Sequence, residues 1–379
     1  MDHDHVRERI QFMRILAMSM AALSIGSASA HATVPKKFRA FDAKLAADCA
    51  AGRFAGVVSV TEGGKRVYSH VCGMSDRSAQ TPITLQSRFK IFSMTKMMTG
   101  LAVMALVDRG KLSMSDSAER YLPDLPQPWR GVTIKQLLEH TSGVPDLTQQ
   151  LLDAYLANPN DGWSGNMKRT LEGASTAPLL ESPGSKWRYN NFGYELLADV
   201  IQRVTDKDFP TAMRDLVFAP AGMRSVEIAR PHIVDGKIDG SEPSAGLAVG
   251  YACKADGGKP LVSYSFVQNG AGSVYANVDD LEQLDRAVRA GRVVSPAMQR
   301  ASITDAFAGT GGSPYGYGVV VRQVEGKTYL QHDGGNNGYV SDFARGVDSA
   351  VTVSALSNDS CADVDGLRKA LMTIELGTR

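Results

Sequence analysis

Strand-like and helix-like patterns occupy different parts of the chain. Residues 56–73 and 315–356 alternate apolar and polar positions as half-buried strands do, and the first stretch turns at Glu62-Gly63-Gly64, which predicts a hairpin. Between about 93 and 235, apolar positions recur with helical spacing instead. We therefore expect an α+β fold, in which an antiparallel sheet built from both chain ends is flanked by helices and carries an inserted, mainly helical lobe.

Both lobes should belong to one cooperative unit, because strands from the two chain ends would share a sheet. We expect a single domain over 31–379, with a sheet lobe at about 35–92 and 240–379 and a helical lobe at about 93–239. Further helices are predicted at 35–50, at 278–290 with Asp279-Asp280 as its cap, and at 361–375.

The first thirty residues have the composition of an export signal. Three arginines precede a short apolar run over 15–25, and Ala28-Ser29-Ala30 then fits an A-x-A cleavage site, with Ala30-His31-Ala32 as a second choice. An amphipathic first helix is the alternative interpretation. We expect a mature chain that begins near His31 and is periplasmic or secreted. No later apolar run is long enough to span a membrane.

Composition narrows the classes of function further. The chain has 379 residues, 43% of them hydrophobic and 21% charged, which is ample material for a large core. A net charge of +1 gives no reason to expect a nucleic acid partner. The chain has four cysteines, which are Cys49, Cys72, Cys253 and Cys361. They would allow two disulfides after export, and three pairings are open. None lies in a C-x-x-C pair, so we expect no structural metal, and no cofactor is indicated.

Ser93-Met94-Thr95-Lys96 is the stretch whose context points most clearly to chemistry. It opens a run of helical spacing that ends near Gly110, and positions three apart on a helix lie on one face. A hydroxyl is a poor nucleophile unless a neighbour takes its proton, which a lysine can do when burial lowers its pKa. The pair indicates a serine acyl-transfer enzyme that needs no histidine base. The alternative is an ordinary serine at a helix start.

A second S-x-x-K, from Ser87 to Lys90, is set apart by its surroundings. Residues 88–92 alternate like a strand, in which positions three apart face opposite sides. A serine at a helix start also aims its own backbone N–H at a developing oxyanion. We therefore select Ser93 as the nucleophile.

Two further clusters could complete such a site. Tyr189 and Asn191 lie in a loop before a predicted helix, where a tyrosine could relay the serine proton; a capping asparagine beside a packed tyrosine is the alternative. His332-Asp333-Gly334-Gly335 follows a predicted strand, and its glycines would let a substrate approach; a simple Gly/Asn turn is the alternative. The chain has no H-E-x-x-H, G-x-S-x-G, phosphate-loop or dinucleotide motif.

The three elements occur in the order S-x-x-K, Y-x-N and H-x-G. In this order the chain resembles the serine β-lactamase and penicillin-binding-protein superfamily. It is most similar to the branch that holds class C β-lactamases, D-Ala-D-Ala carboxypeptidases with a histidine in the third motif, and family VIII carboxylesterases. Connecting segments match too, among them TIKQLLEHTSGV, SPGSKWRYNNFGYELL and HDGGNNGYVSDF, and the likeness runs from about residue 36 to the C-terminus.

The resemblance implies a β-lactamase-like catalytic domain: an antiparallel sheet of five or more strands, a helical lobe, and an active site in the cleft between them. It implies that Ser93 is the nucleophile and that Lys96 and Tyr189 transfer its proton. It also implies that Asn191 binds the substrate and the lysine region.

The third motif supplies the substrate-binding and oxyanion residues that the resemblance implies, and it departs from the class C pattern. By resemblance, His332 and Gly334 line the far wall, and the Gly335 N–H joins the Ser93 N–H in the oxyanion hole. Class C β-lactamases usually carry Lys-Thr-Gly where this chain has His332-Asp333-Gly334. A mostly neutral histidine beside an acidic residue is a weaker anchor for a substrate carboxylate, which shifts the expectation from β-lactamase toward esterase or peptidase.

These observations predict a secreted serine hydrolase that forms an acyl-enzyme on Ser93 and acts on small esters, amides or peptides. A D-stereospecific peptidase, a D-Ala-D-Ala carboxypeptidase and a weak β-lactamase are the alternatives among enzymes. A catalytically silent protein that binds peptidoglycan is the alternative outside them. The sequence does not indicate an oligomeric state.

Overall fold

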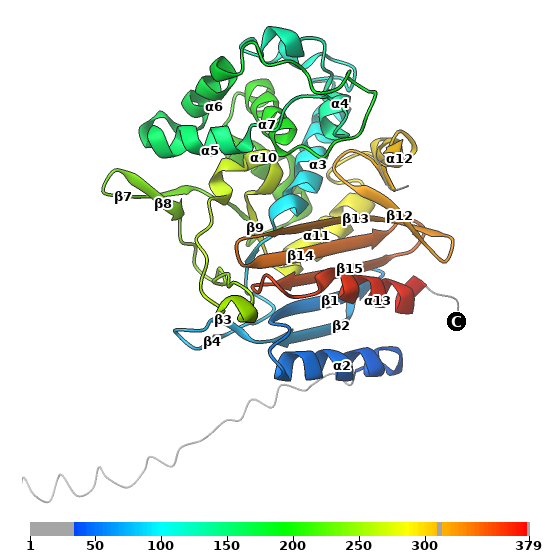
Figure 1. Cartoon of the computed structure of the whole chain (residues 1–379). Coiled ribbons are helices and arrows are strands. Elements are labelled where there is room, and N and C mark those ends of the chain that lie inside the picture. Colours follow the sequence, from blue (N-terminus) through cyan, green and yellow to red (C-terminus); the bar gives the residue numbers. More distant parts are fainter. Residues whose placement is uncertain (1–33, 309–312, 377–379) are drawn as a thin grey trace, which may run out of the picture. The chain divides into compact units, whose positions relative to one another are not determined.

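Both ends of the chain contribute strands to one antiparallel sheet, as the apolar pattern predicted (Figure 1). The computed structural model describes residues 34–308 and 313–376, and its helices and strands all lie in a unit that starts at Pro35. Within these residues the sheet has eight strands, which in spatial order are β10 (Phe307–Ala308), β11 (Pro314–Tyr315), β12 (Val320–Val324), β13 (Lys327–Asn336), β14 (Tyr339–Gly346), β15 (Val351–Ser357), β1 (Gly56–Glu62) and β2 (Lys65–Cys72).

The centre of this sheet is covered on both faces. The predicted hairpin is confirmed as β1 and β2, and β1 also pairs with β15, so that Val57 lies between Leu356 and Val71. Every residue of β15 is buried. The helix α13 (Val364–Leu376) packs on β14 and β15, whereas α11 (Val278–Arg289) packs on β15 and β1 from the opposite side (Figure 1).

Short strands connect this sheet to the rest of the unit. Within the described ranges they form three small sheets: β3 (Met74–Asp76) with β4 (Thr81–Pro82), then β5 (Phe89–Lys90), β9 (Val274–Ala276) and β6 (Glu227–Ile228), and finally β7 (Pro231–Val234) with β8 (Lys237–Ser241). The sheet that contains β5 and β9 matters for the site, because β5 leads directly into the segment that carries Ser93.

The middle of the chain is helical, as expected, and its helices gather beyond one side of the sheet (Figure 1). They are α4 (Ile134–Leu138), α5 (Thr148–Ala157), α6 (Gly162–Gly173), α7 (Asn191–Thr205), α8 (Phe209–Met213), α9 (Ala219–Ala221) and α10 (Asn269–Gly272). The remaining helices are α2 (Arg39–Ala50), α3 (Thr95–Asp108) and α12 (Pro296–Thr304).

The helix α3 lies inside the protein rather than on its surface. All its residues from Thr95 to Leu106 are buried, so it has no solvent-facing stripe in its first three turns. A helix that is apolar all round belongs inside a protein, and α3 contacts α7 and α10 of the helical lobe. The start of α3 is therefore held on all sides, which is what a precisely placed nucleophile requires.

The cap of α11 is also a correction. Asp279 and Asp280 were expected to cap this helix, but the N-cap is Asn277, whose side chain accepts from the Asp280 N–H. Asp280 is the reciprocal partner in this capping box.

Two disulfides settle the open cysteine pairing. Cys49 is joined to Cys72 and Cys253 to Cys361. The predicted export signal lies outside the described residues. Between residues 34 and 376, apart from 309–312, no helix is long and apolar enough to cross a membrane.

Candidate active site

Ser93 lies where a short strand turns into α3. The strand β5 ends at Lys90, and a single turn of 3-10 helix, η2 (Phe92–Met94), carries the serine before α3 begins at Thr95. Phe92 has φ = 43°, a left-handed conformation that is uncommon for a bulky residue. Such backbone strain is characteristic of functional sites, where the surrounding packing maintains it.

The second S-x-x-K does not form a pair. The Ser87 hydroxyl accepts from the Thr84 N–H, and the Lys90 Nζ lies 5.3 Å from the ring centroid of Tyr275. Because Lys90 belongs to β5 and Ser87 to the turn before it, the two side chains have different surroundings, as the strand pattern predicted.

Lys96 is fully buried beneath Ser93. Its Nζ lies 3.2 Å from the Ser93 Oγ, 2.8 Å from the Asn191 Oδ1 and 3.0 Å from the Ala271 carbonyl oxygen. Burial lowers the pKa of Lys96 to about 7, although the nearby Glu195 carboxylate opposes the shift. A substantial fraction of the amine is therefore neutral at neutral pH.

The three contacts of Lys96 define what a neutral amine can do. A neutral amine has two N–H donors and one lone pair. Asn191 Oδ1 and the Ala271 carbonyl can only accept, so they take the two donors, and the lone pair is left facing the Ser93 hydroxyl. This is the geometry of a general base beside its nucleophile.

Tyr189 completes the group around Ser93. A hydrogen bond joins the two hydroxyls, and the Lys96 Nζ lies 4.7 Å from the tyrosine ring centroid. Loss of solvation raises the pKa of Tyr189 well above its ordinary value, which keeps the phenol protonated at neutral pH. The tyrosine can therefore relay a proton, whereas Lys96 is the group that can hold one.

The two asparagines after Tyr189 have different roles. One caps a helix, which was the alternative interpretation, and the other contacts Lys96. Asn190 caps α7, because its Oδ1 accepts from the Gly193 N–H, whereas Asn191 contacts Lys96. The Asn190 N–H donates to the Nδ1 of His140, a buried residue with φ = 61°. His140 thus helps to fix this loop.

His332 is buried in the wall of the site. Its Nδ1 lies 2.6 Å from the Asp333 carbonyl oxygen, so Nδ1 carries the hydrogen, and its Nε2 accepts from the Tyr315 hydroxyl at 2.9 Å. Burial lowers the pKa of His332 to about 4. At neutral pH the third motif therefore offers no positive charge.

The glycines of the third motif bring β13 next to Ser93. A Cβ on Gly334 would lie 2.1 Å from the Ile91 carbonyl oxygen, so only glycine allows this approach. β12 pairs with β13 only as far as Gln331, which leaves the following part of β13, including exposed Gly335, outside that ladder. The structure thus places Gly334 under the nucleophile segment and Gly335 at the strand edge.

A cleft opens next to the segment that carries Ser93. A cavity of about 350 Å³ adjoins Phe92 and is lined largely by polar side chains, including Asp146, Gln149, Gln268, Asn336 and Asn337. The Asp146 Oδ2 accepts from the Asn191 N–H, which links the cleft wall to the residues around Lys96.

Sequence reasoning missed two contributors to the site. The Ala271 carbonyl contacts Lys96, but a backbone atom leaves no signal in a residue pattern. Glu195 is fully buried on α7 and its carboxylate accepts from the Gly270 and Ala271 N–H groups. The sequence does contain a signal for Glu195. A carboxylate inside the apolar run of a helix is buried, and a buried carboxylate needs a polar partner.

The fold built from these helices and strands is shared by solved penicillin-binding proteins and a D-amino acid amidase. The family model described as Beta-lactamase matches residues 37–372. The chain therefore belongs to this family, whose members are serine hydrolases.

Similar proteins include penicillin-binding proteins, an esterase and an amidase. Penicillin-binding protein 4* of Bacillus subtilis is 27% identical over 81% of this chain and 68% of its own length. Esterase EstB of Burkholderia gladioli is 30% identical over 63% of this chain and 66% of its own length. The D-amino acid amidase of Ochrobactrum anthropi superposes with a TM-score of 0.75 at 19% identity, over 90% of this chain and 99% of that one. This last likeness concerns the fold alone.

Proposed function

We propose that this protein is an exported esterase that forms an acyl-enzyme on Ser93. The observation that carries the proposal is the environment of the Lys96 Nζ, where two fixed acceptors direct its lone pair at the Ser93 hydroxyl. Its similarity to esterase EstB supports the same class of reaction.

The reaction follows from these contacts. The Ser93 hydroxyl gives its proton to Lys96, directly or through the Tyr189 hydroxyl, while its oxygen attacks the ester carbonyl. The N–H groups of Ser93 and Gly335 donate to the tetrahedral oxyanion. The same proton returns to the leaving alkoxide, and a water molecule then hydrolyses the acyl-enzyme, with Lys96 again as base.

The charges around the site favour an uncharged ester over a β-lactam, which carries a carboxylate. The third motif itself supplies no cation, because His332 is neutral, and Asp146 and Asp333 both face solvent close enough to act on Lys96. These carboxylates repel a substrate carboxylate.

The same acidic groups favour a second candidate, an amidase or peptidase whose substrate carries a free ammonium group. Hydrolysis of D-alanine p-nitroanilide and of its N-acetyl derivative separates the two candidates. A preference for the free amine over the N-acetyl compound would support the amidase. Preference for p-nitrophenyl butyrate over both would support the esterase.

The nucleophile is tested with two serine variants. Ser93→Ala should abolish turnover of p-nitrophenyl butyrate without unfolding the protein, because it removes one oxygen beside an open cleft. Ser87→Ala is the matched control and should retain activity near that of the wild type. If Ser93→Ala kept its activity, the proposed function would be wrong.

A further inference from the structure

Beneath Lys96, a carboxylate holds the backbone that the lysine contacts. The Glu195 Oε2 lies 3.1 Å from the Gly270 nitrogen and its Oε1 lies 3.2 Å from the Ala271 nitrogen. Thr99 Oγ1 donates to the Gly270 carbonyl on the other side of this turn. The turn is thereby fixed between α7 and α3.

The same turn supplies one of the two acceptors that orient the amine of Lys96. Its Ala271 carbonyl lies 3.0 Å from the Lys96 Nζ. Gly270 has no room for adjustment, because a Cβ there would lie 2.0 Å from the Tyr194 carbonyl oxygen. If the turn moved, the lone pair of Lys96 would no longer face Ser93.

We propose that Glu195 is a positioning residue for the base, which fixes the Ala271 carbonyl that orients the amine of Lys96. This inference rests on the proposed function of the site. The titratable groups that act on or contact Lys96 from the surrounding elements are Asp146, Glu195 and Asp333, the histidines His140 and His332, and the tyrosines Tyr189 and Tyr194. Glu195 is the buried carboxylate among them, whereas Asp146 and Asp333 face solvent.

The test compares Glu195→Gln with Asp199→Asn, a matched control on the same helix. Asp199 is also a buried carboxylate, but it pairs with Arg203. Glu195→Gln should lower kcat/KM for p-nitrophenyl butyrate about 10- to 100-fold, as outer-shell changes do at other sites. Burial raises the pKa of Glu195 to about 8, so the group is largely uncharged in the acidic limb of the pH–rate profile and its replacement should leave the midpoint of that limb in place. The loss should appear in kcat with KM near its wild-type value, because Glu195 contacts the turn and not the substrate.

Asp199→Asn should cost thermal stability and leave kcat near that of the wild type. A Glu195→Gln enzyme with a raised KM and an unchanged kcat would overturn the positioning role, and so would an unchanged kcat/KM. Labelling of wild-type Ser93 by a fluorophosphonate is measured in parallel. If the wild type is not labelled, the proposed function itself has failed, and this inference fails with it.

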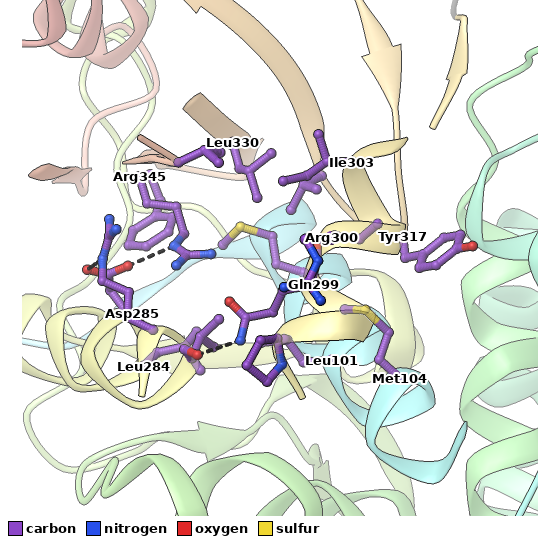
Figure 2. Close-up of a pocket in the computed structure, with 18 residues that line it drawn as sticks. Leu101, Met104, Leu284, Asp285, Gln299, Arg300, Ile303, Tyr317, Leu330 and Arg345 are labelled. Carbon is purple, nitrogen blue, oxygen red and sulfur yellow. Dashed lines mark hydrogen bonds and ion pairs between the residues drawn. The ribbon is translucent and has the colours of Figure 1, made fainter. Parts of the chain in front are cut away.

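A different observation carries a second inference. Behind α3, away from Ser93, a cavity of about 240 Å³ is lined by apolar side chains that include Met97, Leu101, Leu330 and Phe343 (Figure 2). None of the predicted site residues lines it. At the ~30 Å³ that a water molecule occupies in the liquid, this volume holds roughly eight non-hydrogen atoms.

One end of this cavity carries an excess of positive charge. Asp285 is the carboxylate among its lining residues, and it binds both Arg289 and Arg345. Arg289 also donates to two backbone carbonyls, whereas Figure 2 shows the guanidinium of Arg345 turned toward the interior of the cavity. Exposed Arg300 adds a third guanidinium to the lining.

We infer that this cavity binds an alkyl carboxylate of about six carbons, with its chain against α3 and its carboxylate on Arg345. The apolar side chains of the cavity would contact the alkyl chain of the ligand, and the surplus guanidinium would pair with its carboxylate. This inference does not depend on the proposed function.

Saturation-transfer NMR with sodium hexanoate tests it, with hexanol and hexylammonium as the uncharged and cationic comparisons. Hexanoate should bind better than either, and Ile303→Trp, which fills the cavity, should abolish the signal. Thr304→Trp on the exposed side of the same helix is the matched control and should keep it. Equal binding by Ile303→Trp and wild type, or no preference for the anion, would overturn the inference.

Discussion

The Nε2 of His332 lies 2.9 Å from the Tyr315 hydroxyl, and this contact ties the histidine of the third motif into a buried wall. With both ring nitrogens engaged and its pKa lowered to about 4, His332 cannot act as a cationic anchor at neutral pH. Substrate carboxylates lose a charge-assisted hydrogen bond worth about 1.5–3 kcal/mol, or roughly 10- to 100-fold in specificity.

We therefore expect higher kcat/KM for p-nitrophenyl acetate or butyrate than for nitrocefin near pH 7.5. His332→Lys should narrow this gap, if its ammonium group reaches the cleft past Tyr315. Efficient hydrolysis of nitrocefin by the wild type, together with poor ester turnover, would contradict the account.

The sequence predicted the sheet and the contact between Ser93 and Lys96 because both depend on local patterns. Alternation identified β13 to β15, and the contrast between strand and helix spacing separated Ser93 from Ser87. The burial of α3 on every side could not be predicted in this way, because it depends on neighbours that are distant in sequence. The same holds for the orientation of His332, since Tyr315 reaches it across the sheet.

The rate of acylation should depend on the ionisation of Lys96. Burial lowers its pKa to about 7, and only the neutral amine can accept the Ser93 proton. As the pH falls through 7 the amine becomes charged, so log kcat/KM should approach a slope of about +1 below that value and level off above it. A profile measured from about pH 5 to 9 with p-nitrophenyl butyrate checks this. An acidic limb centred near the ordinary carboxylate pKa would assign the base elsewhere.

Lys96 and Tyr189 should behave as a unit. Lys96→Ala and Tyr189→Phe should each slow acylation by about 10²–10⁴-fold, because each removes a group positioned for proton transfer. The double variant should lose much less than the product of the two effects, since both groups serve one proton. Single-turnover kinetics with an activated ester provides the measurement. Strictly multiplicative losses would mean that the two residues act in separate steps.

Both disulfides should stabilise the folded protein. Cys49–Cys72 spans 23 residues and Cys253–Cys361 spans 108. Loop closure of these lengths contributes about 3 and about 5 kcal/mol to the free energy of unfolding in the chain-entropy model. Denatured, unreduced protein should show no free thiol, and reductant should lower Tm. A count of four free thiols would show that neither disulfide forms.

The most direct test of the central claim is a covalent adduct on Ser93. The protein is treated with a fluorophosphonate, digested and examined by mass spectrometry, with Ser93→Ala as the control. The account predicts one stoichiometric adduct on the peptide that carries Ser93, reduced by Lys96→Ala and absent from Ser93→Ala. An unmodified Ser93, or an adduct at another serine that persists in Ser93→Ala, would contradict it.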